Sequence, residues 1–508
     1  MSARGWKTHA WLLGLAAATI VLHLPWLVPG GPWARRPEAL VLGQDEGMAL
    51  YDSLRILRGE VMYRDFFQFH GPVFYYLHAA LFFVVGPSFT AARVLFVLTT
   101  TTSTVLLAAM VARHAGRVAG VAAGLVHACL LVALWPFAYP HWYAETFALG
   151  GLFLITRERS GARGDVAGGA LLGLSILTTQ STGLPALLAA AAAAAGPGLA
   201  ARDLRRSLAR PARILLGAVA GVAPLLVYLA AQGALGLLYY DMFRWPFENY
   251  HFENEGFYGF QTPEAIAAHR KLLGEPWATL GTLALRENLL LPFFALAGAA
   301  AAIPVAVWKI VRRQEDDWAP IVTAAACLGG VSTLFLAPVR ADFHHIAYGG
   351  PFGLLALSLA ARRPRLRPAV LATLCLAAAL AVVTYAHKTA FTWSASRAKG
   401  SFRAEAEKLA GYAAIARAVP PDGTIVVGPM AGFYYFFLRD AAVPITHIPS
   451  TQDKFLTDEQ WRWCAERIAA LGPGAILLPP KPWRELVARR PDLRDRYRPQ
   501  GELLVRSP

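Results

Sequence analysis

Apolar runs long enough to cross a lipid bilayer recur along this chain, and they constrain its fold more than any other feature. About 20 apolar residues span the hydrocarbon core at the helical rise. The runs lie at residues 11–28, 90–112, 118–138, 145–156, 166–180, 184–198, 214–232, 288–308, 318–337, 346–361 and 369–386. Only helices and closed barrels satisfy every backbone polar group in lipid, so we predict a mainly α polytopic membrane protein with about 11 transmembrane helices.

Basic residues gather in every second loop between these runs. They are Arg113 and Arg117; Arg157, Arg159 and Arg163; Arg202, Arg205, Arg206, Arg210 and Arg213; Lys309, Arg312 and Arg313; and Arg362, Arg363, Arg365 and Arg367. Such loops stay cytoplasmic, and we expect the N-terminus there too, with the first run as an uncleaved anchor. Topology thus accounts for the net charge of +15 in a chain that is 56% hydrophobic, and nucleic-acid binding is rejected.

The first outside loop, residues 29–88, contains a predicted amphipathic helix that should lie along the membrane surface. Its apolar positions are Leu50, Leu54 and Leu57, and its polar positions are Asp52, Arg55 and Arg58. A second run, residues 72–85, is apolar but short for a crossing. We treat it as interfacial or re-entrant, because counting it as a span would invert every later segment.

The polar tail, residues 399–508, is predicted to form a small soluble α/β domain on the outside. Helices are expected at residues 402–418, 458–471 and 483–490, and strands at 424–428, 444–448, 475–479 and 501–506. Thr457 and Gln460 have the spacing of a capping box at the start of the second helix. The tail contains no phosphate-binding glycine loop or nucleophile elbow, so support, partner contact or acceptor recognition is expected there rather than catalysis. The four cysteines, Cys129, Cys327, Cys375 and Cys464, are too scattered for a disulfide framework or a thiolate metal site.

Residues capable of acid–base chemistry and anion binding gather on the outside face. They are Asp45 and Glu46 after the first run, Arg64, Asp65 and His70 in the first loop, His141 and Glu145 in the second, Arg270 and Lys271 in the long loop 233–287, and Arg340, Asp342, His344 and His345 in a later loop. The long loop also carries aromatic residues between Tyr239 and Tyr258. The sequence therefore predicts a functional site on that face.

An ordered set of motifs in residues 40–185 resembles the N-terminal module of the GT-C integral-membrane glycosyltransferases. The motifs are Asp45-Glu46-Gly47, Gly59 to Asp65, His70-Gly71-Pro72, Gly86 and Ala91-Ala92-Arg93. The set is most similar to bacterial relatives of the protein mannosyltransferases and of the lipid A aminoarabinose transferase, that is, to glycosyltransferase family 39. The resemblance continues more loosely in residues 340–345 and in the tail.

This resemblance implies a GT-C transmembrane domain over residues 1–398 in the bacterial inner membrane. It also implies a polyprenyl-phosphate-linked sugar donor, an acidic residue of the first outside loop as catalytic base, and inversion at the anomeric carbon. Two positions depart from the family pattern. Residues 140–145 offer only His141 or Glu145 where relatives often have an Asp, and Thr179 replaces a frequent Lys that contacts phosphate.

The chemistry of such a transfer agrees with these residues. A polyprenyl phosphate is already a competent leaving group, so the reaction needs a base for the acceptor hydroxyl and cations for the departing phosphate. We assign Asp45 as the base, with Glu46 beside it, and Arg340 with His345 as phosphate ligands. Arg270 and Lys271 are reserve phosphate ligands. The supporting residues are Asp342, His344, His141, Glu145, Arg64, Asp65 and His70.

Several alternatives remain open from the sequence. Asp45 is also suited to cap the amphipathic helix, and Arg340 and Asp342 are suited to form an interfacial ion pair. His141 and Glu145 are equally suited to end a span, and the aromatic loop is suited to form a belt at the membrane interface. No cofactor is assigned, and a divalent metal held by Asp45, Glu145 and a histidine is the one candidate. A flippase for lipid-linked sugars would require ionisable residues near mid-span; the runs carry their charges at their ends. The third alternative is a non-catalytic scaffold. The acceptor is a glycan, a lipid or a protein, and the sugar is not identified.

Overall fold

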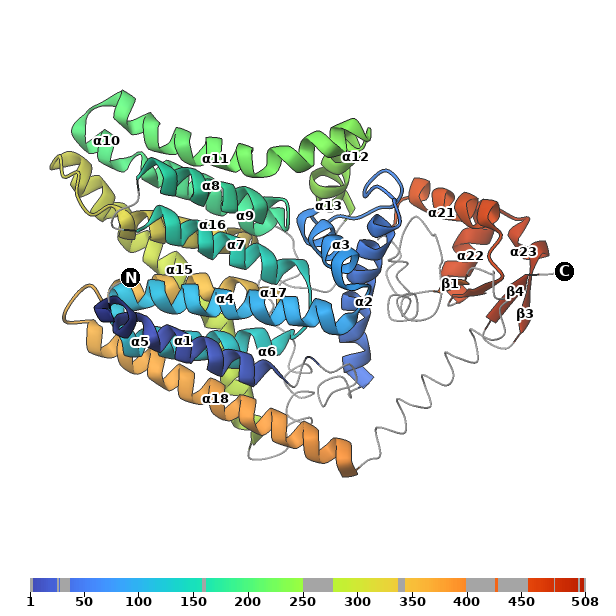
Figure 1. Ribbon diagram of the computed structural model, residues 1–508, viewed down its shortest axis with the longest axis horizontal. Helices are drawn as coiled ribbons and strands as arrows, with labels where there is room; N and C mark the ends of the chain where they lie inside the picture. The colour runs from blue at the N-terminus through green and yellow to red at the C-terminus, as the bar shows by residue number, and fades with distance from the viewer. Residues whose placement is uncertain are drawn as a thin grey trace.

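The computed structural model of the chain describes residues 3–24, 27, 37–157, 161–249, 277–336, 343–398, 425–427, 456–478, 480–500 and 503–506. Most of these residues belong to a bundle of helices, most of which are drawn roughly horizontally in Figure 1. The bundle consists of α1 (Ala3–His23), α4 (Phe89–Ala115), α5 (Arg117–Val126) continued by η2 (His127–Leu131) and α6 (Val132–Leu134), α7 (Pro140–Ile155), α8 (Ala162–Ile176), α9 (Gln180–Ala194), α10 (Gly196–Ala201), α11 (Leu204–Ala231), α15 (Trp277–Val311), α16 (Ala319–Leu336), α17 (Phe343–Ala360) and α18 (Arg367–Ala398).

Every apolar run predicted from the sequence overlaps one or more of these helices. Six segments of the described residues are long and apolar enough to cross a membrane, namely Phe89–Ala115, Arg117–Leu134, Gln180–Ala201, Leu204–Ala231, Leu290–Val311 and Arg367–Ala386. Shorter apolar helices accompany them at Ala10–His23, Val73–Val85, Ala319–Leu334 and His345–Ala360. The chain is therefore a mainly helical, polytopic integral membrane protein.

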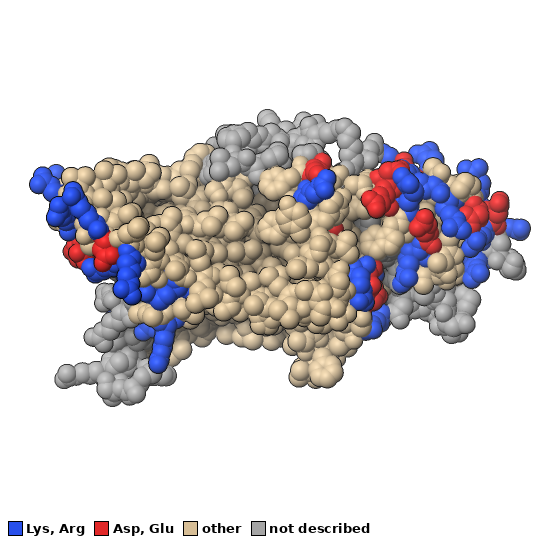
Figure 2. Space-filling model, turned by 90° about the horizontal axis from the view of Figure 1, so that it is seen from above, with Lys and Arg blue, Asp and Glu red and all other residues tan. Residues whose placement is uncertain are grey.

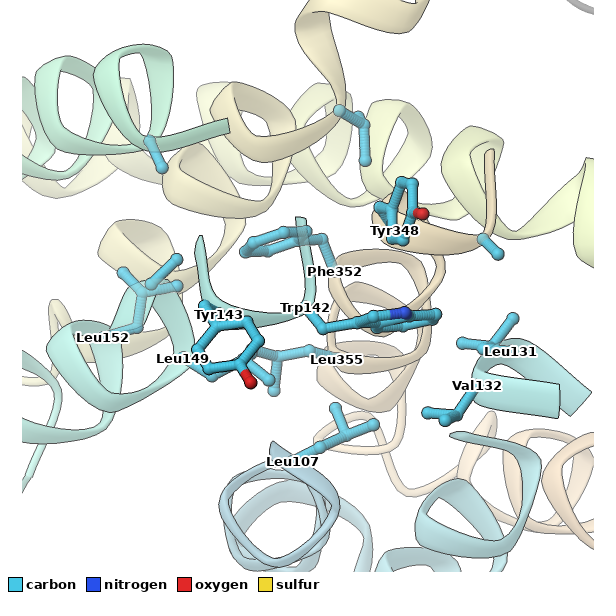
Figure 3. Packing of buried hydrophobic residues seen from close by; sticks show 14 of the residues in the cluster. Leu107, Leu131, Val132, Trp142, Tyr143, Leu149, Leu152, Tyr348, Phe352 and Leu355 are labelled. Atoms are coloured by element: carbon cyan, nitrogen blue, oxygen red, sulfur yellow. The ribbon is translucent and has the colours of Figure 1, made fainter. Parts of the chain in front are cut away.

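Small residues let these helices approach closely. A Cβ added at Gly169 of α8 would lie 2.0 Å from the carbonyl oxygen of Ile214 in α11, and one at Gly173 would lie 2.5 Å from that of Ala218. Lipid offers no hydrophobic driving force between helices, so close backbone contact of this kind is what holds them together. Larger side chains fill the wider spaces, and Figure 3 shows Trp142 and Tyr143 of α7 packed among Leu107, Phe352 and Leu355.

Two further helices cover one end of the bundle. Helix α2 (Pro37–Leu57) runs across the ends of the long helices, and α3 (Val73–Val85) packs against it (Figure 1). The prediction of a surface helix with a polar outer face is wrong in one respect. Asp52 and Arg55 are each only 1% exposed, and of the predicted polar positions Arg58 alone faces out. The loop that follows α2 folds back over this face, since Arg55 donates to Glu60 at 3.0 Å and lies over the ring of Phe66.

Basic residues gather at the opposite end of the bundle, which we call the basic end (Figure 2). There the turns between α4 and α5, α7 and α8, α10 and α11, α15 and α16, and α17 and α18 lie together. The end covered by α2 and α3 is called the site end below. The alternation of basic and non-basic loops read from the sequence therefore corresponds to two distinct ends of the molecule.

The described part of the tail forms a small α/β unit at the site end (Figure 1). Its sheet has the order β1 (Ile425–Val427), β2 (Ala475–Leu477), β4 (Leu503–Arg506), β3 (Tyr497–Gln500), with β1 parallel to β2 and the other two pairings antiparallel. Helices α21 (Asp458–Leu471), α22 (Pro480–Arg489) and α23 (Leu493–Arg496) complete it.

The tail prediction is confirmed for several elements. Helix α21 begins and ends where expected, and both hydrogen bonds of the Thr457–Gln460 capping box are present. Helix α23 and strand β3 were not predicted, because they lie in a charged stretch without clear alternation. The predicted helix 402–418 and strand 444–448 lie outside the described residues.

Candidate functional site

Two carboxylates lie on one face of α2 at the site end. Asp45 is partly exposed and Asp52 is buried, and their spacing of seven residues places them two helical turns apart on the same side. Tyr75 of α3 lies near both carboxylates. Its pKa is raised, chiefly by burial and further by the charges of Asp52 and Asp45 among its neighbours. Helix α2 begins at Pro37, so Asp45 lies inside it. The alternative role of Asp45 as a helix cap is therefore excluded.

Glu46 is committed to an ion pair. The guanidinium of Arg93, in α4, donates to Glu46 from Nη2 at 2.6 Å and from Nε at 3.1 Å, and the backbone N–H of Ala138 donates at 3.1 Å. Glu46 is fully buried. Glu46 therefore connects α2, α4 and the turn before α7, a structural role that differs from the catalytic role predicted for it. Asp45 is the more accessible carboxylate of the two.

Three histidines predicted as site residues come together beside this face. The ring of His141, in α7, lies 5.6 Å from that of His70 and 5.9 Å from that of His345 in α17. Two aromatic rings stack on His141, that of Tyr348 at 4.3 Å and that of Tyr139 at 5.5 Å. Residues from three distant parts of the sequence thus form one imidazole cluster.

A close backbone approach sets the position of His70. Gly71 donates to the carbonyl oxygen of Thr178 at 3.1 Å, and Val73 donates to that of Leu177 at 2.9 Å. A Cβ at position 71 would lie 2.2 Å from the Leu177 carbonyl oxygen, so only glycine fits. The side-chain amide of Gln180, the first residue of α9, also donates to the backbone oxygen of Phe69 at 3.5 Å. The His70-Gly71-Pro72 motif is thereby attached to the start of α9.

Gln68 links two acidic residues, Asp52 and Asp241, to His70 of the imidazole cluster. Its amide donates to Asp52 at 3.0 Å, its side-chain oxygen lies 3.1 Å from Nδ1 of His70, and its backbone N–H donates to Asp241 at 3.3 Å. Asp241 lies in η3 (Tyr240–Arg244), a π-helical turn that continues α12 (Leu235–Tyr239). Burial raises its pKa from 3.8 to about 8, so this carboxyl is mainly protonated at neutral pH.

Arg64 and Asp65 shape the turn that leads to His70. They pair with each other at 2.8 Å, and Asp65 accepts the backbone N–H of Val61 at 2.7 Å. Tyr63 adopts a left-handed backbone conformation (φ 72°) and donates its hydroxyl to the carbonyl oxygen of His70 at 2.8 Å. These predicted supporting residues therefore act on the loop backbone.

The tail docks next to the cluster through Trp245, in α13 (Trp245–Asn249). The indole is fully buried, stacks on Phe69 at 5.4 Å and contacts Phe67 at 4.8 Å, and Phe69 in turn lies 4.4 Å from the ring of His70. Trp461, Cys464 and Ile468 of α21 complete the same apolar cluster. Trp245, one of the aromatic residues of the long loop, thus joins the first loop to the tail.

Glu145 is buried inside the bundle, where it contacts His127 and not a member of the imidazole cluster. Its Oε1 lies 2.9 Å from Nε2 of His127, whose Nδ1 lies 2.8 Å from the hydroxyl of Thr104, and all three side chains are buried. His127 lies in the π-helical segment η2, inside the span Arg117–Leu134. The expectation that the spans carry ionisable groups only at their ends is therefore wrong. Oε2 of Glu145 has no hydrogen-bond partner among the described residues.

The remaining predicted residues are not placed. Arg270, Lys271, Arg340 and Asp342 lie outside the described residues, as does the side chain of His344. Within the described ranges, no three His, Cys, Asp or Glu side chains are arranged to hold a metal ion. The suggested set of Asp45, Glu145 and a histidine is therefore not assembled as a metal site there, and Glu145 instead contacts His127.

Sequence reasoning did not assign site roles to several residues that the fold brings together, namely Asp52, Gln68, Tyr75, Tyr139, Asp241 and Tyr348. One signal was available, since Asp45 and Asp52 are spaced for one helix face. Asp241 and Tyr348 come from segments more than a hundred residues away, and no local pattern identifies them.

Comparisons with known proteins show the fold. No family model and no curated protein sequence matches this chain. Among solved structures it is similar to ArnT from Cupriavidus metallidurans bound to undecaprenyl phosphate, with a TM-score of 0.52, 14% identity, and coverage of 92% of this chain and 88% of that chain. The oligosaccharyltransferase of Archaeoglobus fulgidus, tethered to an acceptor peptide, matches with a TM-score of 0.48, 13% identity, and coverage of 97% and 72%. The similarity to ArnT shows that the chain has a GT-C-like fold.

Proposed function

We propose that this chain is an inverting glycosyltransferase that moves a sugar from a polyprenyl-phosphate-linked donor to an acceptor hydroxyl on the extracytoplasmic side of the membrane. One observation carries the proposal. On a GT-C-like fold, the Asp45 and Asp52 carboxylates share a helix face beside the His70, His141 and His345 cluster, at the end opposite the basic loops. Basic loops stay cytoplasmic, so this face is assigned to the outside, with all eleven apolar helices crossing.

Asp45 is the proposed base. It is partly exposed, whereas Glu46 is enclosed by Arg93 and Asp52 is buried under Gln68. In the proposed step the acceptor oxygen attacks the anomeric carbon, its proton passes to Asp45, and the bond between that carbon and the phosphate oxygen breaks. The electron pair leaves with the polyprenyl phosphate, so the anomeric centre inverts and no separate acid is required.

The phosphate side of the site is assigned to the start of α17. His345 lies there, within the imidazole cluster, and Arg340 precedes it by five residues. A guanidinium offers two parallel donors to phosphate oxygens, and an imidazole adds a third. Arg340 with His345 remains the proposed ligand set, with Asp342 to orient it. The tail, docked beside His70, is proposed to contact the acceptor.

Asp45→Asn tests the proposal. The variant removes the proton acceptor and keeps the side-chain shape, so turnover of the lipid-linked sugar pool in membranes should fall by a factor of about 100 or more. Asp203→Asn is the matched control, because Asp203 caps α11 at the basic end. Both variants should insert and melt like the parent chain. The mass shift of envelope acceptors in cells with and without the chain then identifies the sugar and the acceptor. Wild-type turnover by Asp45→Asn would contradict the role of this residue as base.

A flippase for lipid-linked sugars is a second candidate, favoured by the buried Glu145–His127 pair inside the bundle. Ionisable groups within spans often mark transport pathways. The two functions differ in their products. A transferase joins the sugar to an acceptor, whereas a flippase moves a fluorescent lipid-linked sugar across a vesicle membrane with its glycosidic bond intact.

A further inference from the structure

An apolar groove opens near the basic end of the bundle, far from the imidazole cluster. It lies between α15, the start of α16 and the end of α17, and encloses about 330 Å³. Its walls are small or aliphatic side chains, among them Ala297, Ala301, Val305, Ile321 and Ala356. A volume at the lower end of the range for ligand sites, with a mainly apolar lining, suits a hydrocarbon chain.

The mouth of the groove is positively charged. Lys309, Arg362 and Arg363 line it together with a single carboxylate, Asp317. Arg362 is paired with Asp317, and Lys309 donates to the backbone oxygen of Asp316 at 2.7 Å. Among the residues that the structure describes, no carboxylate pairs with Arg363, which is exposed. One cation at the mouth therefore retains its capacity to bind an anion.

We propose that this groove binds an anionic phospholipid of the surrounding bilayer. One acyl chain lies along the Ala297, Ala301 and Val305 face of α15, and the phosphate contacts Arg363, with Lys309 and Arg362 close by. The two chemistries are complementary to such a lipid: the groove is apolar where the helices cross the membrane, and basic where the headgroups lie. A soluble anion would satisfy only the mouth, and a neutral lipid only the wall.

The site is separate from the proposed transfer site. Its charged mouth lies at the basic end, whereas the carboxylates and histidines lie at the site end (Figures 1 and 2). Lipid binding can therefore be measured without an assay for sugar transfer, and its failure leaves the proposed function untouched.

Native mass spectrometry of the full chain in detergent, titrated with phosphatidylglycerol or phosphatidylcholine, tests the charge at the mouth. The parent chain should retain phosphatidylglycerol preferentially. Arg363→Gln should weaken that retention about fivefold, the effect of one cation near a headgroup. Arg365→Gln is the matched control, because Arg365 is exposed in the same turn but does not line the groove. It should bind like the parent.

A second pair of variants tests the wall. Ala301→Trp places an indole in the groove from an exposed position, and should reduce retention of phosphatidylglycerol as strongly as Arg363→Gln does. Ala300→Trp adds the same side chain on the adjacent exposed position outside the groove, and should leave binding unchanged. Equal affinity for both lipids, or equal losses in a variant and its control, would overturn the proposal. Competition by inorganic phosphate alone would also overturn it, because it would show an anion site without a lipid chain.

Discussion

The indole N–H of Trp245 donates to the side-chain oxygen of Gln460 at 3.2 Å, across 215 residues of sequence. The same oxygen accepts the backbone N–H of Thr457 at 2.9 Å in the capping box of α21. One glutamine thus begins a helix of the tail and attaches that helix to α13. Trp245 also stacks on Phe69, whose ring contacts that of His70. A chain of direct contacts therefore connects the tail to the candidate site.

Trp245→Ala should loosen the tail from the bundle. A buried tryptophan contributes about 3–5 kcal/mol of packing, and its removal also leaves Gln460 with one hydrogen bond fewer. Hydrogen exchange in α21 should accelerate while exchange in α4 stays slow. Phe247→Ala is the control, because Phe247 of the same helix is 74% exposed. Unchanged protection of α21 in Trp245→Ala would mean that other contacts hold the tail.

Arg93→Met should destabilise the protein by about 3–5 kcal/mol, since it leaves the fully buried Glu46 carboxylate without its cation. The expected readout is a lower melting temperature in detergent. Arg58→Met removes an exposed arginine near the same loop and should have little effect. If Asp45→Asn lowered the melting temperature as much as Arg93→Met, Asp45 would be structural as well.

Gly71→Ala should displace the first loop from α9. The new methyl group would lie 2.2 Å from the Leu177 carbonyl oxygen, so the hydrogen bond from Gly71 to Thr178 has to lengthen and His70 moves with it. We expect loss of sugar transfer with correct membrane insertion. Gly14→Ala provides the comparison, because nothing lies within 4 Å of a Cβ there. A fully active Gly71→Ala would show that the position of His70 is not critical.

Asp241 should make stability depend on pH. Its native pKa of about 8 lies above the ordinary 3.8, so the folded state holds a proton that the unfolded state releases. Stability from this group is therefore fully present below about pH 4 and is lost as pH rises to about 8, by at most about 1.4 kcal/mol per pH unit. Asp241→Asn should flatten that slope in melting curves measured between pH 5 and 9. A parent chain whose melting temperature rose with pH over that window, and equally in the variant, would contradict this.

Local patterns determined the helices of this protein. Each apolar run became a helix because lipid-crossing backbone has to satisfy its own hydrogen bonds, and the basic loops gathered at one end because antiparallel helices alternate their ends. The capping box was equally readable, since Thr457 and Gln460 interact over three residues. Of the site, the sequence identified Asp45, His70, His141 and His345 as candidates by residue type and by their side of the membrane.

Only the tertiary structure decided which of these side chains share a site. Glu46 and Asp45 are neighbours in sequence, yet the helix turns one toward Arg93 and leaves the other partly exposed, because successive residues point about 100° apart on a helix. Glu145 contacts His127, and Gln68 donates to Asp241, because the segments that carry them pack together in the fold. Composition and periodicity describe each helix alone. Which side chains contact one another depends on how the helices pack, and no local sequence pattern contains that information.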